Sequence, residues 1–163
     1  MSPPPRHYVV MSVADRQFAM PVDHVRDALG PQRLSAVPLA PRIVAGALSH
    51  RGRIVTAIDL RRCLGFADRD PEGGWMGLIV AHQGALYGLI VDSVDTVLAS
   101  DPQQLESPSA ALDLRWRPVA GGLIRPSGKT AGDKTAGDKT AGDKAIVILE
   151  IGSLLDPVMA EAS

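Results

Sequence analysis

The chain has 163 residues, enough for one domain or for two small ones that share a core, and its formal net charge is −1. Hydrophobic residues make up 45% and charged residues 21% of the sequence, which is typical of a globular protein. This balance excludes a disordered chain and a nucleic-acid-binding protein that depends on a basic surface. The 16 glycines and 13 prolines, beside only two each of Trp, Tyr and Phe, predict many short segments joined by turns.

Three further classes are excluded by what the sequence lacks. No apolar stretch approaches the ~20 residues of a membrane-spanning helix, so we expect no direct membrane insertion. The first residues contain no apolar segment of signal-peptide length, which favours a cytoplasmic location. The single cysteine, Cys63, excludes an internal disulfide framework and a cysteine-based zinc site.

The first elements along the chain are short and apolar. Residues 8–13 and 17–22 flank a polar turn at 14–16, a pattern that predicts a β-hairpin. Residues 25–29 fit either a strand or one helical turn, because five residues are too few to show a period.

An Arg-Gly pair marks the next turn. Residues 36–41 hold two prolines, each of which removes a backbone donor, so they predict an edge segment that leads into a strand at 43–49. Arg51-Gly52 separates that strand from another at 53–58. A short helix should follow at 59–65, with an aspartate as N-cap and a glycine at its end.

The second half repeats the pattern of short strands. The sequence predicts a hairpin of residues 76–81 and 86–91, then strands at 94–98, 119–124 and 145–151, and a terminal helix at 153–160. About ten short strands without a long intervening helix predict a β-sandwich or barrel rather than βαβ units.

A low-complexity insertion separates the last two strands. Thr-Ala-Gly-Asp-Lys occurs three times in tandem at 130–134, 135–139 and 140–144. The repeat has no large apolar residue and cannot bury a core, so we interpret residues 129–144 as a solvated loop insertion.

No segment predicts a catalytic, metal or cofactor site. Ser127-Gly-Lys-Thr130 resembles the end of a phosphate-binding loop, but Leu123 stands where that motif needs its first glycine. Pro126 also lacks the N–H that such a loop would donate. The four histidines lack metal-ligand spacing, and Cys63 beside Leu64 fits a small core residue better than a nucleophile.

Two ordered series of motifs are more specific. The first is Val37-Pro38 and Ala40-Pro41, then Gly46, Arg51-Gly52 and Asp59-Leu-Arg61; the second is Gly88-Leu-Ile-Val-Asp92, then Val94 and Val97. In this order, from about residue 8 to residue 155, the chain resembles the CheW family of chemotaxis adaptors. Each motif alone is weak, but their order is a specific signal.

The resemblance implies an all-β fold with short helices, in which two five-stranded β barrels of the SH3/OB type pack together. We expect a single CheW-like domain over residues 1–163. Its first barrel should cover about residues 18–75 and its second about 76–151, with the terminal segments crossing over. The implied protein is not an enzyme and needs no cofactor.

The resemblance also implies a function and two partners. Members of the family are adaptors that couple the cytoplasmic tip of chemoreceptors to the regulatory domain of a CheA-type histidine kinase. We therefore expect a cytoplasmic scaffold located at receptor arrays beneath the inner membrane. No nucleic acid is expected as a partner.

The family's partner-binding positions transfer to eight residues that match its motifs: Val25, Asp27, Gly46, Arg51, Gly52, Gly88, Asp92 and Val97. Arg51 is the strongest candidate, because an arginine in a tight turn has little use in a core. The glycines could instead be required by the backbone, Asp92 could organise a turn, and the two valines could be core residues.

Two alternative functions stay open at this stage. One is a general double-barrel interaction module in another signalling pathway. The other is a small enzyme or ligand sensor that uses the groove between the barrels. Ser49, His50 and Thr56-Ala57 depart from the family's usual residues, so the sequence does not identify the receptor.

Overall fold

The computed structural model describes residues 4–70, 72–101, 105–106, 116, 119–124 and 145–155. The repeat at 130–144 and the segment 127–130 lie outside the described residues, so their interpretation stays a prediction. The elements in chain order are β1 (Arg6–Val13), β2 (Arg16–Pro21), a 3₁₀ turn η1 (Val22–His24), β3 (Val25–Leu29), β4 (Val44–His50), β5 (Arg53–Asp59), α1 (Leu60–Cys63), β6 (Met76–His82), β7 (Ala85–Val91), β8 (Ser93–Ser100), β9 (Ala120–Ile124) and β10 (Ile146–Leu149). Residues 151–155 are helical and form the described part of the expected terminal helix.

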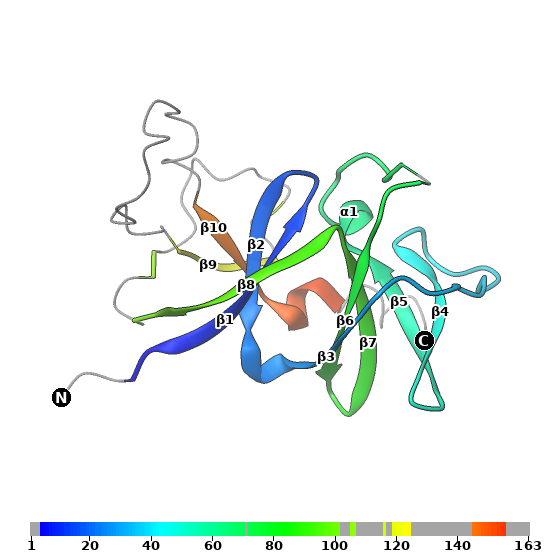
Figure 1. Cartoon of the computed structure of the whole chain (residues 1–163), viewed down its shortest axis with the longest axis horizontal. Coiled ribbons are helices and arrows are strands. Elements are labelled where there is room, and N and C mark those ends of the chain that lie inside the picture. The colour runs from blue at the N-terminus through cyan, green and yellow to red at the C-terminus, as the bar shows by residue number, and fades with distance from the viewer. Residues whose placement is uncertain are drawn as a thin grey trace.

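The described strands form two five-stranded mixed sheets, seen side by side in Figure 1. One sheet has the order β8-β1-β2-β10-β9, and the other has the order β3-β6-β7-β5-β4. Each contains one parallel pair, β2 with β10 and β5 with β7. Among the described residues the ladders run from edge to edge and do not close into full barrels. The expected all-β fold of two packed five-stranded units is confirmed.

The boundary between the two units differs from the expected one near residue 75. Strands β6 and β7 belong to the same sheet as β3, β4 and β5, so that sheet holds all the strands of residues 25–91. The other sheet combines the β1–β2 hairpin with β8, β9 and β10. The physical reason is that β7 pairs in parallel with β5 and antiparallel with β6. These pairings place the β6–β7 hairpin in the sheet that contains β3, β4 and β5.

Three buried clusters explain the continuous apolar runs of the sequence. One cluster lies at the seam between the sheets, and each sheet also has a smaller cluster of its own. Val9 and Met11 of β1 contribute to the seam, whereas Val10 between them contributes to the core of its own sheet. In β6 the same alternation places Leu78 in the seam and Ile79 in the core of the other sheet. Because both faces of these strands are buried, their sequences do not alternate between apolar and polar residues.

An aromatic cluster holds residue 116 against the seam. The Trp116 ring centroid lies 5.2 Å from that of Phe18 and 5.6 Å from that of Phe66. Its indole N–H donates a hydrogen bond of 2.9 Å to the Leu64 carbonyl, and the Arg16 guanidinium lies 4.8 Å from the ring centroid. A buried tryptophan needs such a partner for its N–H, so these contacts fix the Trp116 ring in one orientation.

The short helix α1 begins and ends as the sequence predicts. Asp59 is its N-cap, and its carboxylate accepts a hydrogen bond of 2.9 Å from the Arg61 backbone N–H. Gly65 has a φ of 81°, the left-handed conformation that commonly follows a helix end. From this helix the Arg61 guanidinium donates to the Asp92 carboxylate.

Candidate partner-binding site

The Arg51–Gly52 turn joins β4 to β5 as a two-residue hairpin. Arg51 has a φ of 52° and Gly52 a φ of 81°, and the strands pair up to His50 and Arg53 on either side. Two consecutive positive φ angles define a type I′ turn, which matches the twist of antiparallel strands. A Cβ at Gly52 would meet no atom within 4 Å, so backbone conformation alone explains this glycine. The turn presents the Arg51 side chain to solvent, where it is 80% exposed.

Asp27 holds this hairpin from the neighbouring edge strand. One carboxylate oxygen, Oδ2, lies 3.0 Å from His50 Nε2 and 3.5 Å from Arg51 Nη2. The other, Oδ1, accepts a hydrogen bond of 2.8 Å from the Ala28 backbone N–H. The contact with His50, followed by the bond from Ala28, keeps the pKa of Asp27 below its usual value, so it is ionised at neutral pH. The ion pair thus links β3 to β4, the two edges of one sheet.

Gly46 supports the same strand through a close backbone contact. It has a φ of 150° and lies at a bulge between β4 and β5. The Ser35 carbonyl oxygen would lie 2.6 Å from a Cβ at this position. Ser35 and Ala47 exchange two backbone hydrogen bonds of 2.8 Å each, which fasten the loop before β4 to its edge. Only glycine leaves room for this contact.

Gly88 and Val25 occupy supporting positions. Gly88 is buried in β7, where a Cβ would lie 3.0 Å from Leu48 Cδ2 and 3.7 Å from Ile79 Cδ1. Its missing side chain therefore makes room for Leu48 in the core of this sheet. Val25 is half-buried, pairs with Val80 and packs against the seam.

Val97 lies on the other sheet, far from the Arg51 hairpin along the chain and in the topology. It belongs to β8, which pairs with β1 and forms one edge of that sheet. Its side chain is 55% exposed. An exposed valine on an edge strand offers both apolar surface and unpaired backbone groups.

Asp92 is occupied by an internal network at the junction of the two sheets. Arg61 donates to both of its carboxylate oxygens, from Nε at 2.9 Å and from Nη2 at 2.6 Å. Oδ2 also accepts from the Ala14 backbone N–H at 2.8 Å, and Arg69 Nη2 lies 3.3 Å from Oδ1. Burial alone would raise the pKa of Asp92, but the bonds from Arg61 and Ala14 outweigh it and leave that pKa below its usual value. Asp92 therefore connects the β1–β2 turn to the segment after β5.

The eight predicted residues thus fall into separate places. Asp27, Arg51 and Gly52 come together at the hairpin, with Gly46 behind them on β4. Val25 packs against the seam, Gly88 lies in a core, Asp92 at the junction, and Val97 on the other sheet.

Three further residues were not among the predicted site residues, two of them beside the hairpin and one in the loop before β4. His50 contacts Asp27, Ile54 is 80% exposed at the start of β5, and Leu39 is fully exposed at a φ of 60°. Ile54 lies inside the apolar run 53–58, and nothing in that run distinguishes an exposed position from a buried one. Leu39 follows Pro38, and a proline at this place is a sequence signal for a turn, where a side chain is commonly exposed.

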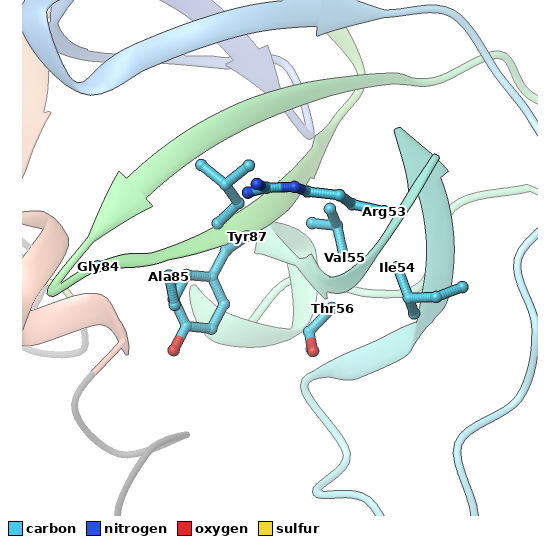
Figure 2. A pocket seen from close by; sticks show the side chains of 8 residues that line it. Arg53, Ile54, Val55, Thr56, Gly84, Ala85 and Tyr87 are labelled. Carbon is cyan, nitrogen blue, oxygen red and sulfur yellow. The ribbon is translucent and has the colours of Figure 1, made fainter. Parts of the chain in front are cut away.

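A cavity of about 340 Å³ lies beside the hairpin, between the first residues of β5 and β7. Figure 2 shows the Arg53 side chain reaching from β5 toward β7, while Ile54 points away from β7. Within the part of the chain that the structure describes, no three His, Cys, Asp or Glu side chains are grouped to hold a metal ion. The described helices are all too short or too polar to cross a membrane.

Comparison with known proteins identifies the family of the chain. A family model of the CheW-like domain matches residues 7–157. The chain belongs to the CheW-like domain family. This CheW-like protein is 26% identical over 120 residues to a probable chemotaxis protein CheW of Rhizobium etli, which covers 73% of this chain and 77% of the relative. It is 25% identical over 125 residues to the chemotaxis protein CheW of Rhizobium meliloti, covering 76% of this chain and 80% of that one.

A solved structure shows the same fold. The scaffolding protein TtCheW from Thermoanaerobacter tengcongensis aligns with a TM-score of 0.75 over 93% of both chains, at 24% sequence identity. The resemblance drawn from the ordered motifs is therefore confirmed for the family and for the fold.

Proposed function

We propose that this CheW-like protein is a non-catalytic chemotaxis scaffold that couples chemoreceptors to a CheA-type histidine kinase. Its family and its relatives named as chemotaxis proteins support this role. The observation that carries the proposal is the Arg51 hairpin, an exposed guanidinium on a tight turn that Asp27 holds in place. The rigid turn fixes the position from which the guanidinium projects, and arginine is common among the residues that dominate protein interfaces.

A bridging protein needs two separate surfaces, and the fold offers them. The Arg51 hairpin belongs to one sheet, whereas Val97 lies on the edge of the other. The seam of buried side chains joins the two sheets, so a partner on one surface is held at a fixed distance from a partner on the other. This arrangement suits one site for the helical hairpin at a receptor tip and one for the kinase regulatory domain.

The eight predicted residues divide into two kinds in this proposal. Arg51, Asp27 and Val97 lie at the contacts with partners; Val25, Gly46, Gly52, Gly88 and Asp92 act by shaping the strands and turns that carry them. In the cell the scaffold would lie in the cytoplasm at receptor arrays beneath the inner membrane. Signalling then depends on contacts that favour one receptor or kinase state over another.

Binding of single-residue variants tests the proposal. We expect Arg51→Glu to weaken capture of one partner, a receptor-tip fragment or a kinase regulatory domain from the same bacterium, by about tenfold. Val97→Glu should weaken capture of the other partner. Arg6→Glu, which makes the same charge change on the other sheet, is the control. Normal binding of both partners by both folded variants would contradict the proposed surfaces.

A further inference from the structure

The cavity beside the Arg51 hairpin exists because two parallel strands diverge. The pairing of β5 with β7 begins only at Thr56 and Tyr87. Strand β5 starts three residues before Thr56, and β7 starts two residues before Tyr87. We call the space between residues 53–55 and 84–86 the slot. Its volume of about 340 Å³ is at the small end of ordinary ligand sites.

The backbone in the slot is arranged as at a sheet edge. His50 and Arg53 close a two-residue turn, so their backbone N–H and C=O groups face each other. Backbone groups of successive strand residues point to opposite sides, so the N–H and C=O of Ile54 point toward β7. By the same argument, His82 and Ala85 close the β6–β7 turn and the backbone groups of Leu86 face β5. The Leu86 C=O takes part in the pairing of Thr56 with Tyr87, so its N–H is the group that β7 offers to the slot. An extended chain could therefore form β-type hydrogen bonds with either wall.

The charge at the slot is positive. Arg53 is exposed and forms no ion pair with any carboxylate of the described residues, unlike Arg51, which contacts Asp27. Its guanidinium extends over the slot toward β7 in Figure 2. The same view shows the hydroxyl groups of Thr56 and Tyr87 on the opposite side of the strands.

We infer that the slot binds an extended, acidic segment of a protein partner. A carboxylate of that segment pairs with Arg53, and its backbone bonds to Ile54 and Leu86. Alternate apolar side chains of the segment contact the exposed Ile54 and the ring of Tyr87. The charge complementarity selects an acidic segment over a neutral or basic one, because a like charge beside Arg53 would cost binding energy. This site goes beyond the Arg51 contact, and its test needs no chemotaxis component.

Nuclear magnetic resonance can test the inference on the full chain. The probe is a capped peptide, acetyl-Thr-Val-Glu-Val-Thr-amide, with matched peptides that carry Gln or Lys at the centre. Addition of the Glu peptide should shift the backbone amide signals of residues 53–56 and 84–87. Its dissociation constant should be roughly two- to fivefold lower than that of the Gln peptide, the difference expected for one exposed ion pair, and lower again than that of the Lys peptide. Added salt should reduce this difference.

Variants separate the slot from a general attraction to the protein. Arg53→Glu should reverse the preference, so that the Lys peptide binds more tightly, whereas Arg6→Glu on the other sheet should leave it unchanged. Ile54→Ser should weaken all three peptides alike. The inference is overturned if the signals shift elsewhere or not at all, or if Glu and Gln peptides bind equally. It is also overturned if the wild-type chain forms a dimer that Arg53→Glu dissociates, because a second copy would then occupy the slot.

Discussion

Gly46 lies against the Ser35 carbonyl, and its replacement by alanine should destabilise the sheet that contains β4 and the Arg51 hairpin. An alanine there would adopt a φ of 150°, at a cost of about 1–3 kcal/mol for a side chain in a region that favours glycine. Its Cβ would lie 2.6 Å from the carbonyl oxygen, so the Ser35–Ala47 bridge must move. Losing the two hydrogen bonds of that bridge costs about 0.5–1.5 kcal/mol each. We expect Gly46→Ala to lower the free energy of unfolding by about 2–6 kcal/mol in total.

Urea unfolding followed by tryptophan fluorescence measures this loss, since Trp116 is buried and Trp75 is half-buried. A loss of this size should lower the melting temperature by roughly 4–24 °C. Two glycine variants calibrate the result. Gly52→Ala meets only the cost of a positive φ, about 1–2 kcal/mol, because no atom lies near its Cβ. Gly30→Ala meets neither obstacle and should be neutral or slightly stabilising.

The outcome separates two explanations of Gly46. If the glycine serves the backbone contact, stability and partner binding fall together, and the amide protons of Ser35 and Ala47 exchange faster. If Gly46 instead touches a partner directly, binding falls while stability stays at the wild-type value. A Gly46→Ala variant as stable as the wild type would therefore refute the steric argument.

Three more predictions concern the interior. Asp92→Asn should cost about 2–3 kcal/mol at neutral pH, because it removes the charged partner of the half-buried Arg61. Since the pKa of Asp92 is lower in the folded chain than in the unfolded one, its contribution is complete above about pH 4 and is lost as the pH falls below that value. Acid unfolding should accordingly be less steep in the variant, and an unchanged acid profile would contradict this assignment. Burial raises the pKa of Cys63 to about 12, so a thiol reagent should label the half-buried thiol far more slowly in the folded chain than after unfolding; equal labelling rates in the two states would disprove this. Trp116→Phe loses the bond to Leu64 and should lower stability by about 1–3 kcal/mol in urea titrations, with no change expected if that bond is dispensable.

Local features of this fold follow from short stretches of sequence. The Arg51–Gly52 turn is readable because glycine tolerates the second positive φ of a type I′ turn. Asp59 is readable as a helix cap because its carboxylate needs only the N–H two residues later. The order of such motifs also identified the family, since each is tied to its own turn or cap.

The functional assignment of single residues could not be read in this way. Gly88 and Gly46 are both strand glycines, yet one makes room for a leucine side chain and the other for a carbonyl oxygen. Asp92 bonds to Arg61, 31 positions earlier in the chain, and sequence spacing does not reveal that contact. Ile54 is exposed beside the buried Val55, although both belong to one apolar run.

The sequence by itself determined the short strands, the two-residue turns, the helix cap and the family. It determined them because backbone conformation and hydrogen bonding within a few residues depend on side chains close in the chain. Only the tertiary structure decided how the ten described strands divide between two sheets, and which edge carries the Arg51 hairpin and which carries Val97. Those choices depend on pairings such as β1 with β8 and β2 with β10, whose partners are far apart along the chain. The free energy of such pairings comes from burying both faces of each strand. Many of these strands have similar apolar compositions, so the sequence of one strand does not identify its partner.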